Sequence, residues 1–243
     1  MNKDLALFTP MANEEKHAEK FILEVLSYSK YFNNFKYFII IDKISRDNTF
    51  LIAKNIEKKN KYLKVIWSPE NKCLVDAYVK GYESCINTGY EWILEIDAGG
   101  SHNPKNIHNF IPFMNSDFDC LYGSRFCQGG EMINANIIRL LLSKGGSILS
   151  KIFFKINLQD TTSGFQMFRL NTLKLLLNKK IISKNRFFQT EIKIYTRKLK
   201  QKEIPIQYNC KTQTVGIPFY LNAIFESIYL LFKLKFFKKN YIE

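Results

Sequence analysis

Short apolar runs alternate with helical patterns through the first half of the chain, and this alternation constrains the fold more than any other feature. Five runs have the length and the branched or aromatic side chains of buried strands, at residues 5–10, 37–42, 63–68, 92–97 and 119–124. Apolar residues recur at helical spacing between the first four of them, at 14–29, 46–60 and 73–89. Strands that alternate with helices predict β-α-β units, so we expect an α/β fold with a mostly parallel sheet.

The second half of the chain has a less regular pattern. It contains an apolar helical stretch interrupted by Gly145 and Gly146, a turn-rich run leading into a strand or a helix, a mainly helical stretch and a short strand, at residues 134–154, 160–168, 172–201 and 203–209. No internal repeat or low-complexity linker separates these parts. We therefore expect one large domain over residues 1–215, followed by a basic amphipathic helical tail over residues 216–243.

Polar residues stand at the ends of three of the predicted strands. Pro10 ends the first, Asp42 ends the second and Asp97 ends the fourth. In open α/β sheets a ligand binds outside the carboxyl ends of the strands, so these side chains should meet in one crevice. A strand-terminal aspartate also caps helices and turns, but a pair of them favours a shared ligand site.

The charge of the chain favours anionic partners. Its 36 Lys and Arg residues outnumber 22 Asp and Glu residues, which gives a net charge of +14 and a pI near 9.4. Nucleic acid, an anionic membrane and phosphorylated substrates all suit such a charge, whereas abundant solvated lysine is the plainer interpretation. No recognised nucleic-acid-binding motif is present, so we expect no nucleic-acid partner. Five cysteines without C-x-x-C spacing indicate neither a disulfide framework nor a zinc site, and they fit a reducing compartment.

The expected tail has the composition of a segment that lies on a membrane. The first residues lack the apolar length of a signal peptide, and the most apolar candidate span, residues 217–237, is broken by Asn222, Glu226 and Lys233. Aromatic and leucine side chains beside several lysines provide two membrane signals. We therefore expect peripheral association with the cytoplasmic, inner face of a membrane. A buried helical pair or the interface of a homodimer would explain the same pattern.

Six sequence runs together resemble a known enzyme family. They are "TPMANEE" at 9–15, "IIIDKISRDNTFLIAK" at 39–54, "EIDAGGSHNP" at 95–104, "YGSRF" at 122–126, "DTTSGFQMF" at 160–168 and "FFQTEI" at 187–192. Their order resembles that of family 2 glycosyltransferases, in the branch that contains dolichol-phosphate mannosyltransferase and other polyprenyl-phosphate sugar synthases. The resemblance covers about residues 5–210. It implies a GT-A-type nucleotide-binding α/β sandwich, extended here by the C-terminal amphipathic helical segment.

The resemblance also implies a reaction. A sugar would move, with inversion at the anomeric carbon, from a UDP- or GDP-linked donor to an acceptor. The acceptor would be a polyprenyl phosphate or another lipid-phosphate or glycan precursor of the cell envelope. A catalytically weakened relative that serves as a scaffold or binding protein is the alternative, because two carboxylates of the family pattern are missing at Lys43 and Gly99.

The first two motifs imply the donor pocket. The family pattern P-x-x-N-E-E matches the first run, and D-D-G-S-x-D-x-T matches the second with Lys43 in place of the second Asp. By resemblance, the carboxylate at the end of the second strand contacts the base or the ribose. The implied nucleotide-binding residues are Pro10, Asn13, Glu14, Asp42 and Asp47.

The third motif implies a metal site that is altered in this chain. The family's Asp-x-Asp falls on Asp97, Ala98 and Gly99, so only Asp97 keeps its carboxylate. The flank that begins at Ser101 matches the family and would lie near the diphosphate. A hard cation takes several oxygen ligands, which one carboxylate, a diphosphate and water supply less tightly. We expect Mg²⁺ or Mn²⁺ to bind weakly at Asp97, or basic side chains to neutralise the diphosphate.

The remaining motifs imply residues on the acceptor side. Arg125 falls where the family has an arginine near the phosphates or the acceptor, and a guanidinium fork suits phosphate oxygens. Asp160 and Ser163 would shape the acceptor or donor side, and Gly164 would permit a close approach of the backbone.

Three further residues complete the implied site. Gln189 and Glu191 match positions that face the sugar, and Glu191 would be the general base if the acceptor is a hydroxyl. A polyprenyl phosphate acceptor needs no base. Lys211 takes the place of an arginine in a loop that closes over the donor phosphates.

Overall fold

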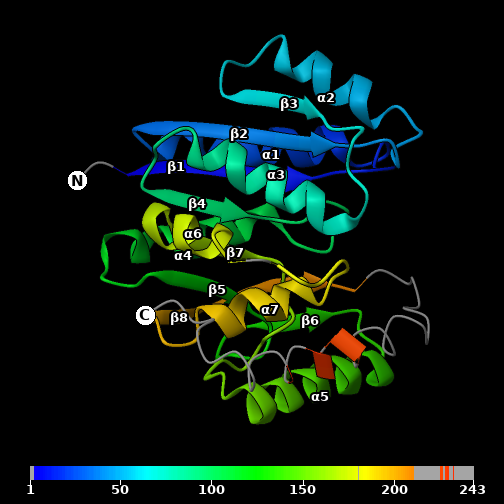
Figure 1. Cartoon of the computed structure of the whole chain (residues 1–243). Coiled ribbons are helices and arrows are strands. Elements are labelled where there is room, and N and C mark those ends of the chain that lie inside the picture. The colour runs from blue at the N-terminus through cyan, green and yellow to red at the C-terminus, as the bar shows by residue number, and fades with distance from the viewer. Residues whose placement is uncertain (1–2, 180, 211–224, 227, 230–231, 233–243) are drawn as a thin grey trace.

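A seven-stranded sheet forms the centre of the molecule (Figure 1). The computed structural model describes residues 3–179, 181–210, 225, 226, 228, 229 and 232. The strands are β1 (Asp4–Pro10), β2 (Asn34–Ile41), β3 (Leu63–Trp67), β4 (Trp92–Glu95), β5 (Cys120–Ser124), β7 (Gln166–Arg169) and β8 (Gln201–Pro205). Their order is β3-β2-β1-β4-β7-β5-β8, and β7 alone in this sheet runs antiparallel to its neighbours. The expected α/β fold with a mostly parallel sheet is confirmed.

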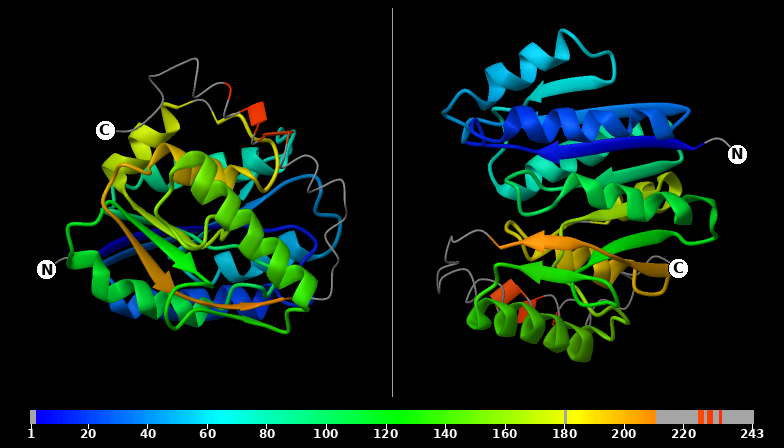
Figure 2. Two further views of the ribbon diagram at one scale, coloured as in Figure 1. Left: turned by 90° about the horizontal axis from the view of Figure 1, so that it is seen from below. Right: turned by 180° about the vertical axis from the view of Figure 1, so that it is seen from behind.

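Helices cover both faces of this sheet because its strands are apolar on both sides (Figure 2). In β1, Leu5 and Leu7 face one core while Ala6 and Phe8 face the other, as the alternation of side chains along a strand requires. The first core is closed by α1 (Ala18–Ser27), α2 (Thr49–Glu57) and α4 (Ile107–Phe110). The second is closed by α3 (Leu74–Ile86), α6 (Leu170–Leu177) and α7 (Phe188–Tyr195).

The remaining elements lie beyond the main sheet or connect its parts. A small parallel pair of strands, β6 (Glu131–Ile133) and β9 (Gln207–Asn209), forms a second sheet that the sequence pattern did not predict. The helix α5 (Ile137–Phe154) runs along the end of the molecule opposite α2 (Figure 1). Short 3-10 turns are η1 (Tyr28–Tyr31), η2 (Pro104–Asn106) and η3 (Ile111–Asn115).

The five strands and three helices predicted in the first half are all present, but the second half differs in three places. The helix α5 is continuous through Gly145 and Gly146, because two glycines weaken a helix by only about 1 kcal/mol each without breaking it. The stretch predicted as mainly helical holds α6 and α7, and the residues described between them, 178, 179 and 181–187, are not helical. The run at 160–168 leads into a strand, β7, and the last predicted strand is divided at Ile206 into β8 and β9.

The expected tail falls almost entirely outside the described residues. The boundary near residue 215 therefore stays a prediction. Within the part of the chain that the structure describes, no helix has both the length and the apolar character needed to span a membrane.

One close contact fixes how α3 lies on the sheet. Gly81 of α3 faces Phe8 of β1, and a Cβ atom at Gly81 would lie 2.0 Å from Cδ2 of the Phe8 ring. Phe8 is fully buried and packs edge-on against Tyr82, with ring centroids 4.7 Å apart. The ring therefore has no room to move away from an added methyl group.

We predict that Gly81→Ala lowers the free energy of unfolding by about 1–3 kcal/mol, because it overpacks the core between α3 and β1. Gly145→Ala is the matched control, since a Cβ there meets no atom within 4 Å and alanine favours a helix by up to about 1 kcal/mol. Urea denaturation of both variants gives the two values. Equal stabilities of the two variants would show that α3 does not pack this closely.

Candidate active site

The carboxyl ends of β1, β2 and β4 open into one cavity of about 930 Å³. Asp42 and Asp97 both line it, so the predicted meeting of strand ends in one crevice is confirmed. Loops that follow the parallel strands must pass over this edge of the sheet, which explains why distant motifs converge there. The predicted site residues that line the cavity are Pro10, Asn13, Glu14, Asp42, Asp47, Asp97, Gly99, Ser101, Arg125, Ser163 and Gln189.

The loops after β1 and β2 are tied together by side chains of the first two motifs. Asn13 adopts a left-handed conformation, with φ of 57°, and its Nδ2 donates to the carbonyl oxygen of Ile44 at 3.0 Å. Asp47 accepts a hydrogen bond from the backbone N–H of Glu15 at 3.0 Å. Asp42 is buried and accepts one from the N–H of Ile44. These bonds give the rim of the cavity a fixed shape.

Asp97 is a partly buried residue of the cavity wall. The Tyr78 hydroxyl donates to its Oδ1 at 2.5 Å, and 34% of the side-chain surface remains open to the cavity. Burial of the rest raises the pKa of Asp97, against the Tyr78 hydrogen bond and the positive charges of Arg186 and Lys193. His102 Nε2 lies 3.8 Å from Oδ2, but burial lowers the pKa of His102 to about 3. The imidazole is therefore neutral and does not compete with a cation for this carboxylate.

A second, fully buried carboxyl lies beneath Asp97, at the last residue of β4, two residues earlier in the chain. Glu95 accepts hydrogen bonds from the Tyr82 hydroxyl and from the side-chain amides of Gln166 and Gln189. Burial, together with the charge of Asp97, raises the pKa of Glu95 well above its ordinary value. Burial thus disfavours the charged form of Glu95, while Asp97 lies at the cavity wall, partly open to solvent.

Lys193 completes this buried network from helix α7. Its Nζ donates to the carbonyl oxygens of Ser163 at 2.9 Å and Gln189 at 3.2 Å, and burial lowers its pKa. Gly164 lies just above the network, where a Cβ atom would stand 2.7 Å from Oδ2 of Asp97 and 2.9 Å from Nε2 of Gln189. The predicted close backbone approach at Gly164 is therefore confirmed.

Glu14 occupies the space that a side chain at position 99 would need. Gly99 has φ of +89°, and a Cβ atom built there would lie 2.8 Å from Oε1 of Glu14. Both residues line the cavity together with Asp97. The carboxylate that the family motif would carry at position 99 is missing, but another carboxylate, from the loop after β1, stands in its place.

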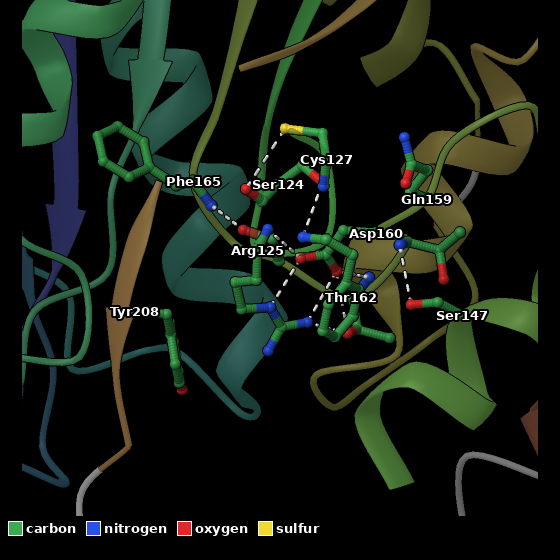
Figure 3. A network of polar contacts seen from close by, with 12 residues as sticks. Ser124, Arg125, Cys127, Ser147, Gln159, Asp160, Thr162, Phe165 and Tyr208 are labelled. Atoms are coloured by element: carbon green, nitrogen blue, oxygen red, sulfur yellow. Dashed lines mark hydrogen bonds and ion pairs between the residues drawn. The ribbon is translucent and has the colours of Figure 1, made fainter. Parts of the chain in front are cut away.

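Arg125 is held at the cavity wall by a buried ion pair with Asp160 (Figure 3). Its Nε and Nη2 donate to the two carboxylate oxygens at 2.7 Å each, and its backbone N–H donates to the same carboxylate at 3.0 Å. Burial alone would raise the pKa of Asp160, but the charge and hydrogen bonds of Arg125 lower it below its ordinary value. The Tyr208 ring lies 5.1 Å from the guanidinium carbon.

Two residues predicted to face the ligands do not line the cavity. Asp160 lies behind Arg125 and positions it, instead of contacting the acceptor side directly. Glu191 is fully buried elsewhere: its carboxylate accepts the backbone N–H groups of Ile182 at 2.8 Å and Ser183 at 2.9 Å, and the Tyr195 hydroxyl at 2.7 Å. Its side chain ties the loop before α7 to the helix, so the structure gives no support to a catalytic base at Glu191.

Two lysines stand at positions of the family motifs. Lys211 is outside the described residues, so its predicted position over the phosphates stays a prediction. Lys43 is exposed and does not line the cavity, so it does not oppose a bound cation there.

Sequence reasoning missed several residues of the site. Arg139, Arg186, Tyr78 and Tyr208 line the cavity, and Glu95 lies directly beneath it. The one available signal was Glu95, a carboxyl inside an otherwise apolar strand. Arg139 lies on α5 and Arg186 lies in the non-helical stretch before α7. Neither helical periodicity nor motif spacing distinguishes these two arginines in the sequence.

Comparison with known proteins agrees with this geometry. The model of the family described as "Glycosyl transferase family 2" matches residues 7–176, which is more than half of the chain. The chain therefore belongs to glycosyltransferase family 2, and it is a glycosyltransferase.

Two characterised relatives fall in the polyprenyl-phosphate branch. The undecaprenyl-phosphate mannosyltransferase of Micrococcus luteus is 29% identical over 172 residues, which cover 70% of each chain. The polyprenol monophosphomannose synthase of Mycolicibacterium smegmatis is 26% identical over 155 residues, which cover 63% of this chain and 58% of that relative.

The fold is shared with a more distant solved structure. Glucosyl-3-phosphoglycerate synthase from Mycobacterium tuberculosis, crystallised with Mn²⁺ and UDP-glucose, superposes with a TM-score of 0.69 over 94% of this chain and 79% of that one. At 10% sequence identity this likeness shows the GT-A-type fold alone.

We predict that Glu191→Gln lowers the free energy of unfolding by about 1–3 kcal/mol. The glutamine amide has only one acceptor oxygen, so it cannot accept all the hydrogen bonds that now hold the loop before α7. Turnover by the folded variant, measured well below its melting temperature, should fall less than about threefold. A base would lose about a hundredfold or more when neutralised. A loss of that size with unchanged stability would restore Glu191 as the base.

Proposed function

We propose that this glycosyltransferase moves a sugar, with inversion, from a UDP- or GDP-linked donor to a polyprenyl phosphate. The observation that carries the proposal is the composition of the cavity: Asp42, Asp97 and Arg125 meet there, while Glu191 lies outside it. The names of the two relatives, which give a polyprenyl phosphate and mannose, support the acceptor class and make mannose the first sugar to test.

The donor would lie across the strand ends. We assign the base and ribose to the pocket between Pro10 and Asp42, where the backbone of the tied loops after β1 and β2 forms the wall. The diphosphate would lie towards Asp97, since Arg186 lines the cavity and its positive charge acts on that carboxylate. Gln189, whose amide is fixed by Glu95, would hold a sugar hydroxyl.

The acceptor step needs no general base in this arrangement. A phosphate monoester is already an anion, so its oxygen attacks the anomeric carbon without losing a proton. The carbon–oxygen bond to the donor diphosphate breaks as the new bond forms on the opposite face. Arg125 and Arg139 line the cavity and would bind the acceptor phosphate. A guanidinium binds an anionic phosphate more strongly than it binds a neutral hydroxyl acceptor.

A divalent cation fits this cavity only with the help of the donor. No group of three or more His, Cys, Asp or Glu side chains suited to a metal ion occurs among the described residues. Asp97 and Glu14 nevertheless present carboxylates to the same space, and hard cations take oxygen ligands. We propose that these two side chains hold Mg²⁺ or Mn²⁺ when the diphosphate supplies further oxygens. The ion would neutralise charge on the leaving diphosphate.

The lipid acceptor places the reaction at a membrane surface. We propose that the chain associates peripherally with the cytoplasmic face, where nucleotide sugars are available. The positive net charge supports this location, because it attracts the chain to anionic lipid.

We predict that Asp97→Asn lowers sugar transfer to undecaprenyl phosphate by about a hundredfold or more, because it removes a carboxylate that would hold the cation beside the leaving diphosphate. The assay uses GDP- and UDP-linked hexoses with Mg²⁺ or Mn²⁺. Asp117→Asn is the matched control: this carboxylate is exposed, pairs with Lys200 and lies outside the cavity, so activity should not change.

Two results would contradict the assignment. If Asp97→Asn and wild type were equally active, Asp97 would have no part in catalysis. If wild type were inactive with every donor, acceptor and metal, the chain would be the scaffold that its missing carboxylates at positions 43 and 99 suggest.

A further inference from the structure

The apolar face of the helix α5 points away from the protein, which is the reverse of the usual orientation of a surface helix. Its large apolar side chains point away from the protein, each with half or more of its surface exposed: Ile137, Ile138, Leu141, Ile148, Leu149, Ile152 and Phe153. Its inward face instead carries Ser147 and Ser150, both buried, and Phe154, which joins the core. Surface helices normally turn their apolar stripe inward, so this face requires a partner.

A hydrogen bond to a neighbouring loop fixes this rotation of the helix. The Ser147 hydroxyl oxygen accepts the backbone N–H of Thr161 at 3.2 Å, in the loop that also contains Asp160 (Figure 3). At the first turn, the Asn136 side chain caps the helix by accepting the N–H of Arg139 at 2.8 Å. Turning the apolar residues inward would break the contact to the loop that holds Arg125.

The charge on α5 identifies the chemistry of the partner. Lys144 and Lys151 are exposed on the helix and Lys155 is exposed directly after it, while the sequence of α5 contains no aspartate or glutamate. A second copy of this face would bring the same positive charge against it. Apolar side chains bordered by lysines match the two parts of an anionic bilayer, which are acyl chains and phosphate headgroups.

The position of α5 relates this face to the cavity. Arg139 lies on α5 and lines the cavity, so the helix forms part of its wall. Figures 1 and 2 show α5 along the outer edge of the molecule, at the end opposite α2. The same views place the described residues 225, 226, 228, 229 and 232 at this end. Phe225, Tyr229 and Phe232 each expose more than half of their surface.

We propose that the outer face of α5 docks the chain on an anionic lipid bilayer. Docking in this orientation brings Arg139 and the adjoining cavity edge to the level of the headgroups. A phosphate that is anchored by a lipid then reaches the cavity without leaving the membrane surface. The proposal rests on the proposed polyprenyl phosphate acceptor for its purpose, but docking itself is measured without any substrate.

Vesicle flotation of the full chain tests the docking. Wild type should float with vesicles of phosphatidylcholine and phosphatidylglycerol, less with phosphatidylcholine alone, and less as salt increases. In Leu149→Glu/Ile152→Glu, binding to the anionic vesicles should fall about tenfold or more, because two inserted side chains become charged. The matched control is Leu23→Glu/Leu51→Glu, which makes the same change at similarly exposed leucines of α1 and α2 and should float like wild type.

Three results would overturn the proposal. In the first, the α5 variant floats as well as the control. In the second, wild type is a dimer in sedimentation velocity and the α5 variant a monomer, which makes this face a contact between copies. In the third, the α5 variant melts well below the control, which shows that the face is covered by the chain itself.

A thermal-shift titration with GDP and UDP separates this proposal from the proposed function. The α5 variant should keep the nucleotide-induced shift of wild type, since its substitutions lie outside the cavity. Flotation of a wild-type chain that binds no nucleotide would leave docking intact and contradict the proposed function. Nucleotide binding without flotation would contradict docking through α5 and leave the proposed function intact.

Discussion

The buried ion pair between Arg125 and Asp160 joins the end of β5 to the loop before β7, which is bonded in turn to β8 and α5. Asp160 fixes both the side chain and the backbone of Arg125, and Glu203 of β8 in turn accepts the N–H of Asp160 at 3.0 Å. The next residue in that loop, Thr161, is bonded to α5 through Ser147. Removing one partner of such a pair leaves an uncompensated buried charge, at a cost of about 3–5 kcal/mol. The position of Arg125 in the cavity wall therefore depends on this ion pair, and the loop that carries Asp160 also anchors α5.

The donor side has a separate support. Asp97 follows the end of β4, above a buried network in which the amide of Gln189 donates to Glu95 and burial raises the pKa of Glu95. Of these two carboxyl groups, Asp97 lines the cavity. Glu14 then brings a second one from another loop, into the space left by Gly99. The site thus keeps two carboxylates, although only Asp97 belongs to the Asp-x-Asp motif.

The sequence predicted what depends on local pattern and failed where tertiary orientation decides. Apolar runs marked the strands, and the strand ends at Asp42 and Asp97 marked the cavity, because parallel strands must end at a common edge. Glu191 was misplaced because a motif gives the position of a helical residue but not the direction in which it points. The helical period of α5 was correct, yet nothing local shows that its apolar face turns outward. Glu14 could not be recognised as a neighbour of Gly99, since the contact joins loops 85 residues apart.

The central claim is that the cavity holds a nucleoside diphosphate at Asp97 and Glu14. Crystals of the full chain soaked with GDP or UDP and Mn²⁺ provide its most direct test. Data collected at the manganese absorption edge should give an anomalous peak in contact with both carboxylates. The nucleotide density should extend from that peak to the pocket between Pro10 and Asp42. Nucleotide bound elsewhere, or a manganese peak distant from both carboxylates, would contradict the account.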